Sequence, residues 1–279
     1  MDEFIRGIIY IICGFIFFFI GKVIYDLVRR KFKVNVELIE KDNQALAIAL
    51  VGYYLGLIFS IGGSIVGPTK GLTDDLIDIA IYGFLAILLL NLSSFINDRF
   101  ILRRFSTTKE IIQDQNIGTG IVEGSLFLAS GLIIFGAVSG EGGSVWTAVI
   151  FWLLGQFVLV ILGYIYNLMT PFDIHEEIEK DNIAVGVAFS GAIIAVGNIV
   201  RFGISGPFIS WFNDITSFAA YVIIGFILLP LIRLATDKVI LPGRKITEEI
   251  VGQAKPNIGV AYIEAFSYIG ASLFIGWAI

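Results

Sequence analysis

Eight long stretches of almost uninterrupted apolar residues alternate with short polar segments along the chain. About 20 helical residues cross a bilayer core about 30 Å thick, so each stretch predicts a transmembrane helix. Helices are favoured because backbone groups in lipid must find their hydrogen bonds within the spanning segment. The predicted spans are Phe4–Tyr25, Asn43–Val66, Ile79–Asn97, Asn116–Val138, Val145–Met169, Asn182–Val200, Ile215–Ile232 and Asn257–Trp277.

Composition agrees with lipid as the solvent of this chain. Of 279 residues, 57% are hydrophobic and 15% are charged, and the mean hydropathy is +0.87. A soluble domain of this length needs a larger polar surface. Residues Met1 to Arg6 lack the basic region and the small-residue cleavage site of a secretory signal, so the first stretch is expected to stay as a helix.

The distribution of basic residues predicts the orientation of the spans. Of the 19 Lys and Arg residues, 16 fall in or beside the linkers after the first, third, fifth and seventh spans. Only Arg6, Lys70 and Arg201 belong to the other side. Because cytoplasmic loops carry the excess of Lys and Arg, both termini are expected outside and the four charged linkers in the cytoplasm.

The second half of the chain repeats the first. Residues Asp75–Arg99 resemble Asp214–Lys238, and Glu40–Asn43 resembles Glu179–Asn182, each separated by 139 positions. Four predicted helices separate equivalent positions, so the two halves share one orientation and form a parallel repeat. We therefore expect an all-α membrane protein of two four-helix halves, 1–142 and 143–279, each made of two helix hairpins.

An asparagine opens every second span. These residues are Asn43, Asn116, Asn182 and Asn257. Asparagine accepts hydrogen bonds from the free N–H groups of a first helical turn, so a helix-capping role is the main interpretation. A role in binding a substrate or an ion is the alternative.

Two glutamates lie within apolar spans. Glu123 and Glu264 each stand seven residues after an opening asparagine, at equal depth in the two halves. An ionised carboxylate is costly at such a depth, so these acids suit the binding and release of protons. The alternative hypothesis is a hydrogen bond between helices that only positions them. Asn91, Asn116, Asn257 and Tyr262 are candidate polar support for these acids.

Other chemistry is not indicated by the sequence. It holds no phosphate-binding loop, no dinucleotide glycine pattern and no metal-ligand cluster, and it has one cysteine and one histidine. We expect no enzymatic activity, no catalytic residues, no cofactor and no bound metal. The basic stretch Arg29–Lys33 suits anionic lipid headgroups better than nucleic acid.

The pattern Asn-Asp-Arg-x-Ile-Leu-x-x-Phe at Asn97–Phe105, followed by Lys109-Glu110-Ile111, Asn116 and Val122-Glu123-Gly124, resembles the bacterial DUF350 membrane proteins. The second copy departs from it: Thr236 replaces Asn97, Pro242 falls in the linker, and Ile263-Glu264-Ala265 replaces Val-Glu-Gly. The resemblance covers nearly the whole chain and implies a fused pair of four-helix units. It also implies a bacterial inner-membrane location, a suggested link to envelope stress, and Glu123 and Glu264 as the family's membrane acid.

Two functional hypotheses follow. In the first, the protein is a channel or transporter that moves protons or other cations by means of Glu123 and Glu264. In the second, it is a membrane scaffold without transport that recruits envelope-stress partners through its basic linkers. The lipid bilayer is the expected partner in both, with a homo-oligomer as a further possibility.

Overall fold

The computed structural model describes residues 3–279, which fold into helices and their connections. Eight of these helices are long and apolar enough to cross a membrane. They are α1 (Glu3–Val28), α2 (Gln44–Ile65), α3 (Leu72–Ile96), α5 (Ile117–Val138), α6 (Val145–Met169), α8 (Ile183–Ile204), α9 (Trp211–Ala235) and α11 (Ile258–Ala278). The eight predicted spans are thereby confirmed, and the chain is a multi-pass membrane protein.

The third and seventh spans begin earlier than predicted. Helix α3 starts at Leu72 and α9 at Trp211, seven and four residues before the predicted Ile79 and Ile215. Asp74 and Asp75 lie in the first turn of α3, and Asp214 lies in that of α9, where negative charge is favoured by the helix dipole.

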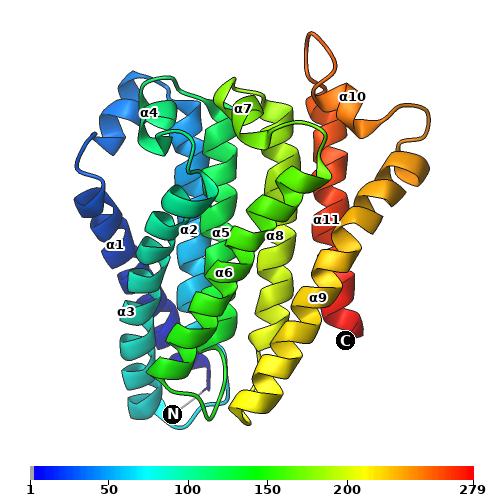
Figure 1. Ribbon diagram of the computed structural model, residues 1–279. Coiled ribbons are helices and arrows are strands. Elements are labelled where there is room, and N and C mark those ends of the chain that lie inside the picture. The colour runs from blue at the N-terminus through cyan, green and yellow to red at the C-terminus, as the bar shows by residue number, and fades with distance from the viewer. Residues whose placement is uncertain (1–2) are drawn as a thin grey trace.

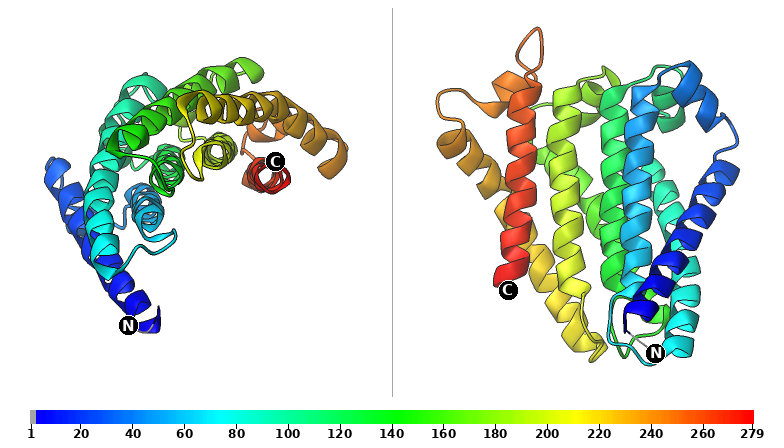
Figure 2. Two further views of the ribbon diagram at one scale, coloured as in Figure 1. Left: turned by 90° about the horizontal axis from the view of Figure 1, so that it is seen from below. Right: turned by 180° about the vertical axis from the view of Figure 1, so that it is seen from behind.

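The helices form two rows that curve in an arc (Figure 2, left). We call α2, α5, α8 and α11 the inner row; it lies on the concave side of the arc, and α1, α3, α6 and α9 form the outer row. Each inner helix begins at the end of the molecule that carries the short helices, which we call the linker end (Figure 1). The chain termini lie at the opposite end, which we call the terminal end. The four inner helices are therefore parallel to one another, as the repeat predicted.

Short helices cover the linker end. They are α4 (Thr107–Ile112), α7 (Ile174–Glu179) and α10 (Ile246–Ile250), with π-helical turns at Val36–Glu40, Asn97–Ile101 and Thr236–Ile240. Asn43, Asn116, Asn182 and Asn257 each accept a hydrogen bond from the third residue of the following helix, which confirms their capping role. The orientation of the two ends across the membrane stays a prediction.

Small residues allow the inner helices to pack against one another closely. A Cβ built on Gly52 would overlap the backbone of Gly124, and one built on Gly191 would overlap the backbone of Ala265. Close approach of this kind holds helices together by van der Waals packing in lipid. It continues from α5 of the first half to α8 of the second, so the halves merge in one row.

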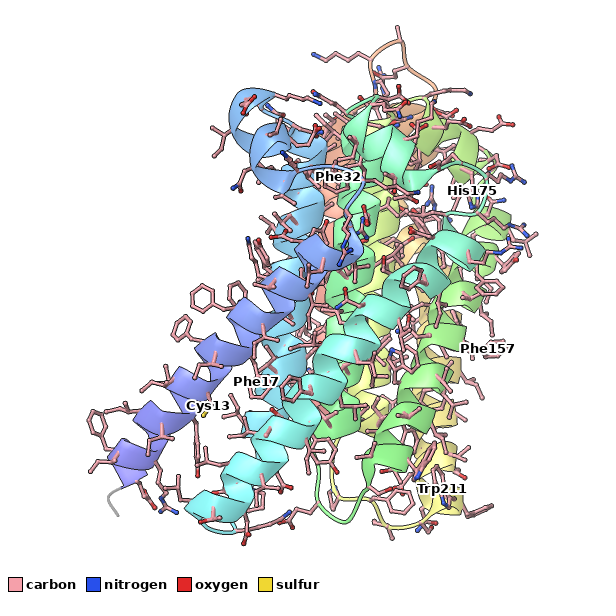
Figure 3. All side chains as sticks on the ribbon, turned by 90° about the vertical axis from the view of Figure 1, so that its left-hand side faces the viewer. Cys13, Phe17, Phe32, Phe157, His175 and Trp211 are labelled. Atoms are coloured by element: carbon pink, nitrogen blue, oxygen red, sulfur yellow. The ribbon has the colours of Figure 1, made fainter. Side chains whose placement is uncertain are left out.

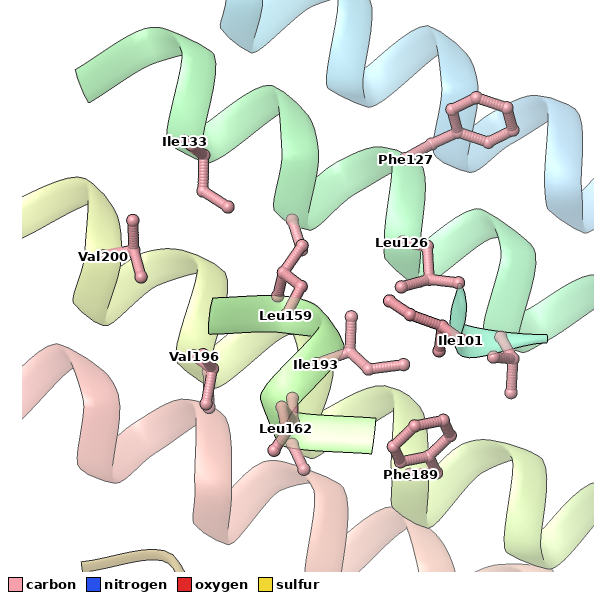
Figure 4. Packing of buried hydrophobic residues seen from close by; sticks show 14 of the residues in the cluster. Ile101, Leu126, Phe127, Ile133, Leu159, Leu162, Phe189, Ile193, Val196 and Val200 are labelled. Carbon is pink, nitrogen blue, oxygen red and sulfur yellow. The ribbon is translucent and has the colours of Figure 1, made fainter. Parts of the chain in front are cut away.

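The centre of the molecule lies where α5, α6 and α8 meet. Leu126, Leu159, Phe189 and Ile193 pack there between the two rows (Figure 4). In the most apolar window of α8, 89% of the residues are buried, against 11% in α1, so α8 is central and α1 peripheral. Phe157, at mid-span of α6, is 62% exposed (Figure 3), as expected of a lipid-facing side chain.

Candidate functional site: two buried carboxylate–arginine centres

Glu123 forms an ion pair with an arginine from the end of α1. Arg29 Nη2 donates to Glu123 Oε1 at 2.5 Å and to Ser94 Oγ at 2.9 Å. The guanidinium carbon lies 5.0 Å from the centroid of the Tyr25 ring. Glu123 is buried, and its second oxygen, Oε2, has no hydrogen-bond partner among the described residues. We call these four residues the first centre.

Glu264 has a similar environment in the second half. Arg233 Nη1 donates to Glu264 Oε1 at 2.6 Å, and the Tyr268 hydroxyl donates to the same oxygen at 3.2 Å. Arg233 Nη2 also donates to Thr247 Oγ1 at 3.2 Å. The described residues offer no hydrogen bond to Glu264 Oε2, and the whole residue is 0% exposed. We call Glu264, Arg233, Tyr268 and Thr247 the second centre.

The arginines come from positions that the repeat does not relate. The first centre takes its cation from α1, whose second-half counterpart is α6, where the matching residue is Thr170. The second centre takes its cation from α9, and the residue matching Arg233 is Ser94 of α3. A carboxylate buried at this depth requires a compensating positive charge. The two halves satisfy that requirement by different routes.

The second centre is next to a cavity. Arg233 lines a pocket of ≈ 270 Å³ at the linker end, together with Pro230, Asp237, Lys245 and Thr247. None of the first-centre residues lines this pocket. The two arginines are similarly accessible, with 15% of the Arg29 side chain and 13% of the Arg233 side chain exposed, so it is the pocket beside Arg233 that distinguishes the second centre.

Polar groups continue from the second centre toward the terminal end. Tyr268 and Ser272 follow Glu264 at intervals of four residues, on one face of α11. Asn198 Nδ2 donates to Ser272 Oγ at 3.1 Å, and Arg201 Nε donates to Asn198 Oδ1 at 3.0 Å. At about 1.5 Å per helical residue, Glu264 to Ser272 spans about 12 Å along α11.

The first half lacks this series of polar side chains. Its residues matching Tyr268 and Ser272 are Phe127 and Gly131. The residues matching Asn198 and Arg201 are Phe59 and Gly62. The two centres are thus similar at the carboxylate, but only the second is followed by this series of polar side chains toward the terminal end.

The residues predicted as polar support lie apart from the carboxylates. Asn91 donates to the Tyr53 hydroxyl at 3.3 Å and to its own helix at Ile87 O. Asn116 and Asn257 cap their helices and donate to Glu110 and Glu249 of the linkers.

Tyr262 is 60% exposed. In the described part of the chain, Glu264 accepts from Arg233 and Tyr268 and not from Tyr262. None of the four predicted support residues reaches a centre.

Sequence reasoning missed both arginines. Both were counted among the basic residues in or beside the linkers. The carboxylate nearest to Arg233 in the sequence, Asp237, accepts from the backbone N–H of Ile246. A signal for Arg233 existed: it replaces Ser94 in the last turns of an apolar span, where a charge needs a buried partner.

Comparison with known proteins shows which family the chain belongs to. The model of the family described as "Domain of Unknown Function (DUF350)" matches it twice, at residues 1–138 and 142–279. The chain belongs to the DUF350 family. Each family match contains one carboxylate–arginine centre, because the first ends at the terminal end of α5 and the second spans α6 to α11.

Two relatives carry the name UPF0719 transmembrane protein. One, from Aquifex aeolicus, is 25% identical over 264 residues, which cover 93% of this chain and 94% of that protein. The other, YshE of Bacillus subtilis, is 28% identical over 121 residues, which cover 43% of this chain and 84% of that protein. No solved structure matches the chain. The second relative agrees with a tandem form of a shorter unit.

Proposed function

We propose that this protein moves protons across the bacterial inner membrane through its second half, with Glu264 as the proton-carrying group. The observation that carries the proposal is the series of polar residues Glu264, Tyr268, Ser272, Asn198 and Arg201, which begins beside the pocket at Arg233. It covers about 12 Å of α11, and Asn198 and Arg201 extend it on α8. No similar series exists in the described first half.

The arrangement at Glu264 suits protons better than metal cations. Arg233 and Tyr268 both donate to Oε1, so Oε2 is the atom that can accept a proton. A metal ion at this carboxylate would face the positive charge of Arg233 at close range.

Protonation of Glu264 removes the charge that holds Arg233. The guanidinium then has Thr247 and the Tyr166 hydroxyl as remaining partners, at 3.2 and 3.5 Å. Asp237 lines the same pocket and offers a carboxylate. Movement of Arg233 toward the pocket would free Glu264 to pass its proton to the Tyr268 hydroxyl, in the direction of the terminal end. One helical turn separates Tyr268 from Ser272, and a water molecule between their hydroxyl groups would complete this part of the path.

The first centre has a positioning role in this proposal. Arg29 stays between Glu123, Ser94 and the Tyr25 ring, which fixes the end of α1 against α3 and α5. Along α5, Glu123 is followed by Ser125, which donates to Val122 O, and by Ser130, which bonds to Gln156. Neither serine bonds to Glu123, so no series of hydrogen bonds among the described residues leads onward from this acid.

A scaffold without transport is the second candidate. The observation that favours it is the burial of both glutamates, each already neutralised by an arginine. In that case the charged linkers would bind anionic lipids and envelope-stress partners, and both centres would only hold the helices together.

Proton flux into proteoliposomes under an imposed potential separates the two candidates. We expect the native protein to acidify the vesicles, and Glu264→Gln to abolish the flux while the protein stays folded. Native flux equal to that of empty liposomes would contradict the proposal and favour the scaffold.

A further inference from the structure

A repeated hydrogen bond joins each inner helix to the next linker. The side-chain Nδ2 of Asn43 donates to Ile111 O at 2.9 Å. Asn116 donates in the same way to Ile178 O at 2.7 Å, and Asn182 to Ile250 O at 2.9 Å. Each acceptor directly follows a linker glutamate and belongs to the linker that leads into the neighbouring inner helix. The junctions between α2, α5, α8 and α11 are therefore built alike.

At the two ends of the inner row, the donor and the acceptor position of this hydrogen bond are present without a neighbouring inner helix. Asn257, at the start of α11, donates to Glu249 and to no linker carbonyl among residues 3–279. At the α2 end, Leu38 follows the linker glutamate Glu37 and so occupies the position of Ile111, Ile178 and Ile250. A donor at one end thus matches an acceptor position at the other.

A second bond shows the same complementarity. The backbone N–H of Gly118, two residues after Asn116, donates to Asp181 Oδ1 at 3.0 Å. The matching donor on α11 is the N–H of Gly259, and the matching acceptor before α2 is Asp42. Gly259 and Asp42 are both exposed, and Asp42 has the same left-handed backbone as Asp181.

Side-chain size at the two end faces agrees with a contact near the linker end. Two residues after the capping asparagine, the internal junctions have Ala45, Gly118 and Ala184, and α11 has Gly259. Four residues after it, they have Gly120, Gly186 and Ala261, and α2 has Ala47.

Farther from the linker end, bulky residues replace the small ones of the internal junctions. They are Val51 and Ile58 on α2, and Phe266 and Trp277 on α11. The faces can approach closely in the first turns only, and would diverge toward the terminal end.

We propose that the α2 face of a second copy of this chain docks on α11, head to tail, with Asn257 and Gly259 facing Leu38 and Asp42 of the neighbour. The contact would continue the α2–α5–α8–α11 series from one copy into the next. A repeated head-to-tail contact closes a ring when its rotation fits, and the arc of the inner row turns in one sense (Figure 2). The site is thus an interface between copies, independent of proton movement.

Cysteine cross-linking in native-membrane nanodiscs tests the contact. In a Cys13→Ser background, Asp42→Cys plus Gly259→Cys is oxidised with copper phenanthroline. The internal control is Gly118→Cys plus Asp181→Cys, which is expected to form a bond within one chain. Lys33→Cys plus Lys180→Cys, on other parts of the linker end, measures random collision.

We expect the end pair to give linked dimers or larger species well above the collision pair, and the internal control to stay at the mass of one chain. An end pair that links no better than the collision pair, while the internal control reacts, would overturn the proposal and assign these faces to lipid. Should the variants fail to fold, native mass spectrometry of the unmodified protein decides, and a single chain per nanodisc would overturn it.

Discussion

Arg233 neutralises Glu264 from the position that Ser94 holds in the first half, and Ser94 instead accepts a hydrogen bond from Arg29. The arginine of each centre is therefore on a different element of the repeat, although the carboxylates are equivalent. A buried carboxylate fixes the need for a cation and leaves open which neighbouring helix supplies it. This chain contains both arrangements: Arg29, at the end of α1, neutralises Glu123, and Arg233 of α9 neutralises Glu264.

Supplying an arginine to Glu264 from α6 in place of α9 should restore part of the stability that is lost when Arg233 is removed. Arg233→Ser leaves Glu264 without its cation, and we expect a loss of about 3–5 kcal/mol in the free energy of unfolding. Adding Thr170→Arg, the position that matches Arg29, should recover part of that loss. Thermal unfolding in detergent measures both variants. Thr170→Arg in the native background is the control, since a second buried cation should destabilise the protein. If Arg233→Ser and the double variant were equally stable, an arginine at position 170 would not neutralise Glu264 as Arg29 neutralises Glu123, and the prediction would be wrong.

Gly52 should not tolerate a side chain. Its Cβ would overlap the backbone of Gly124, so Gly52→Ala has to force α2 and α5 apart. We expect a loss of about 1–3 kcal/mol, as is usual for overpacking. The matched control is Gly7→Ala in α1, where nothing lies within 4 Å of the added carbon. Unfolding in mixed micelles compares them, and a neutral Gly52→Ala would show that the helices are not in close contact.

The transmembrane fold was predictable because hydropathy and capping are local properties. Runs of apolar residues defined the eight spans, and Asn43, Asn116, Asn182 and Asn257 marked where the inner helices begin. The glutamates were found for the same reason, as charges inside apolar runs. The short helices α4, α7 and α10 were missed because five or six residues carry too little periodicity.

The partners of the glutamates were not predictable from the sequence. A long arginine side chain can reach several helices, so its partner depends on how the helices pack. The repeat was misleading here, since it suggests that equivalent acids have equivalent partners, whereas Arg29 and Arg233 are not related by it.

Stability at the linker end should depend on the ionisation of Asp173. Burial works to raise the pKa of this carboxyl, but the backbone N–H of His175 and the guanidinium of Arg104 outweigh it, and the pKa is lowered. A lowered pKa stabilises the folded state above the ordinary value for Asp, about 3.9, and the benefit disappears as the pH falls through the lowered value. Asp173→Asn should therefore be less stable than the native protein at neutral pH.

That difference should shrink as the pH is lowered through about 4 and below. Unfolding midpoints in detergent at several pH values measure it, with Asp114→Asn, on another linker, as the control. A constant difference between native and Asp173→Asn at all pH values would show that the Asp173 charge contributes nothing.

The central claim, that protons pass through the second half only, is tested most directly by comparing Glu264→Gln with Glu123→Gln in proteoliposomes. Both substitutions remove one buried carboxylate beside an arginine, so they match in chemistry and in depth. We predict that Glu264→Gln abolishes proton flux and that folded Glu123→Gln retains it, with Ser272→Ala reducing it. Equal flux in both glutamine variants, or loss in Glu123→Gln alone, would contradict the account.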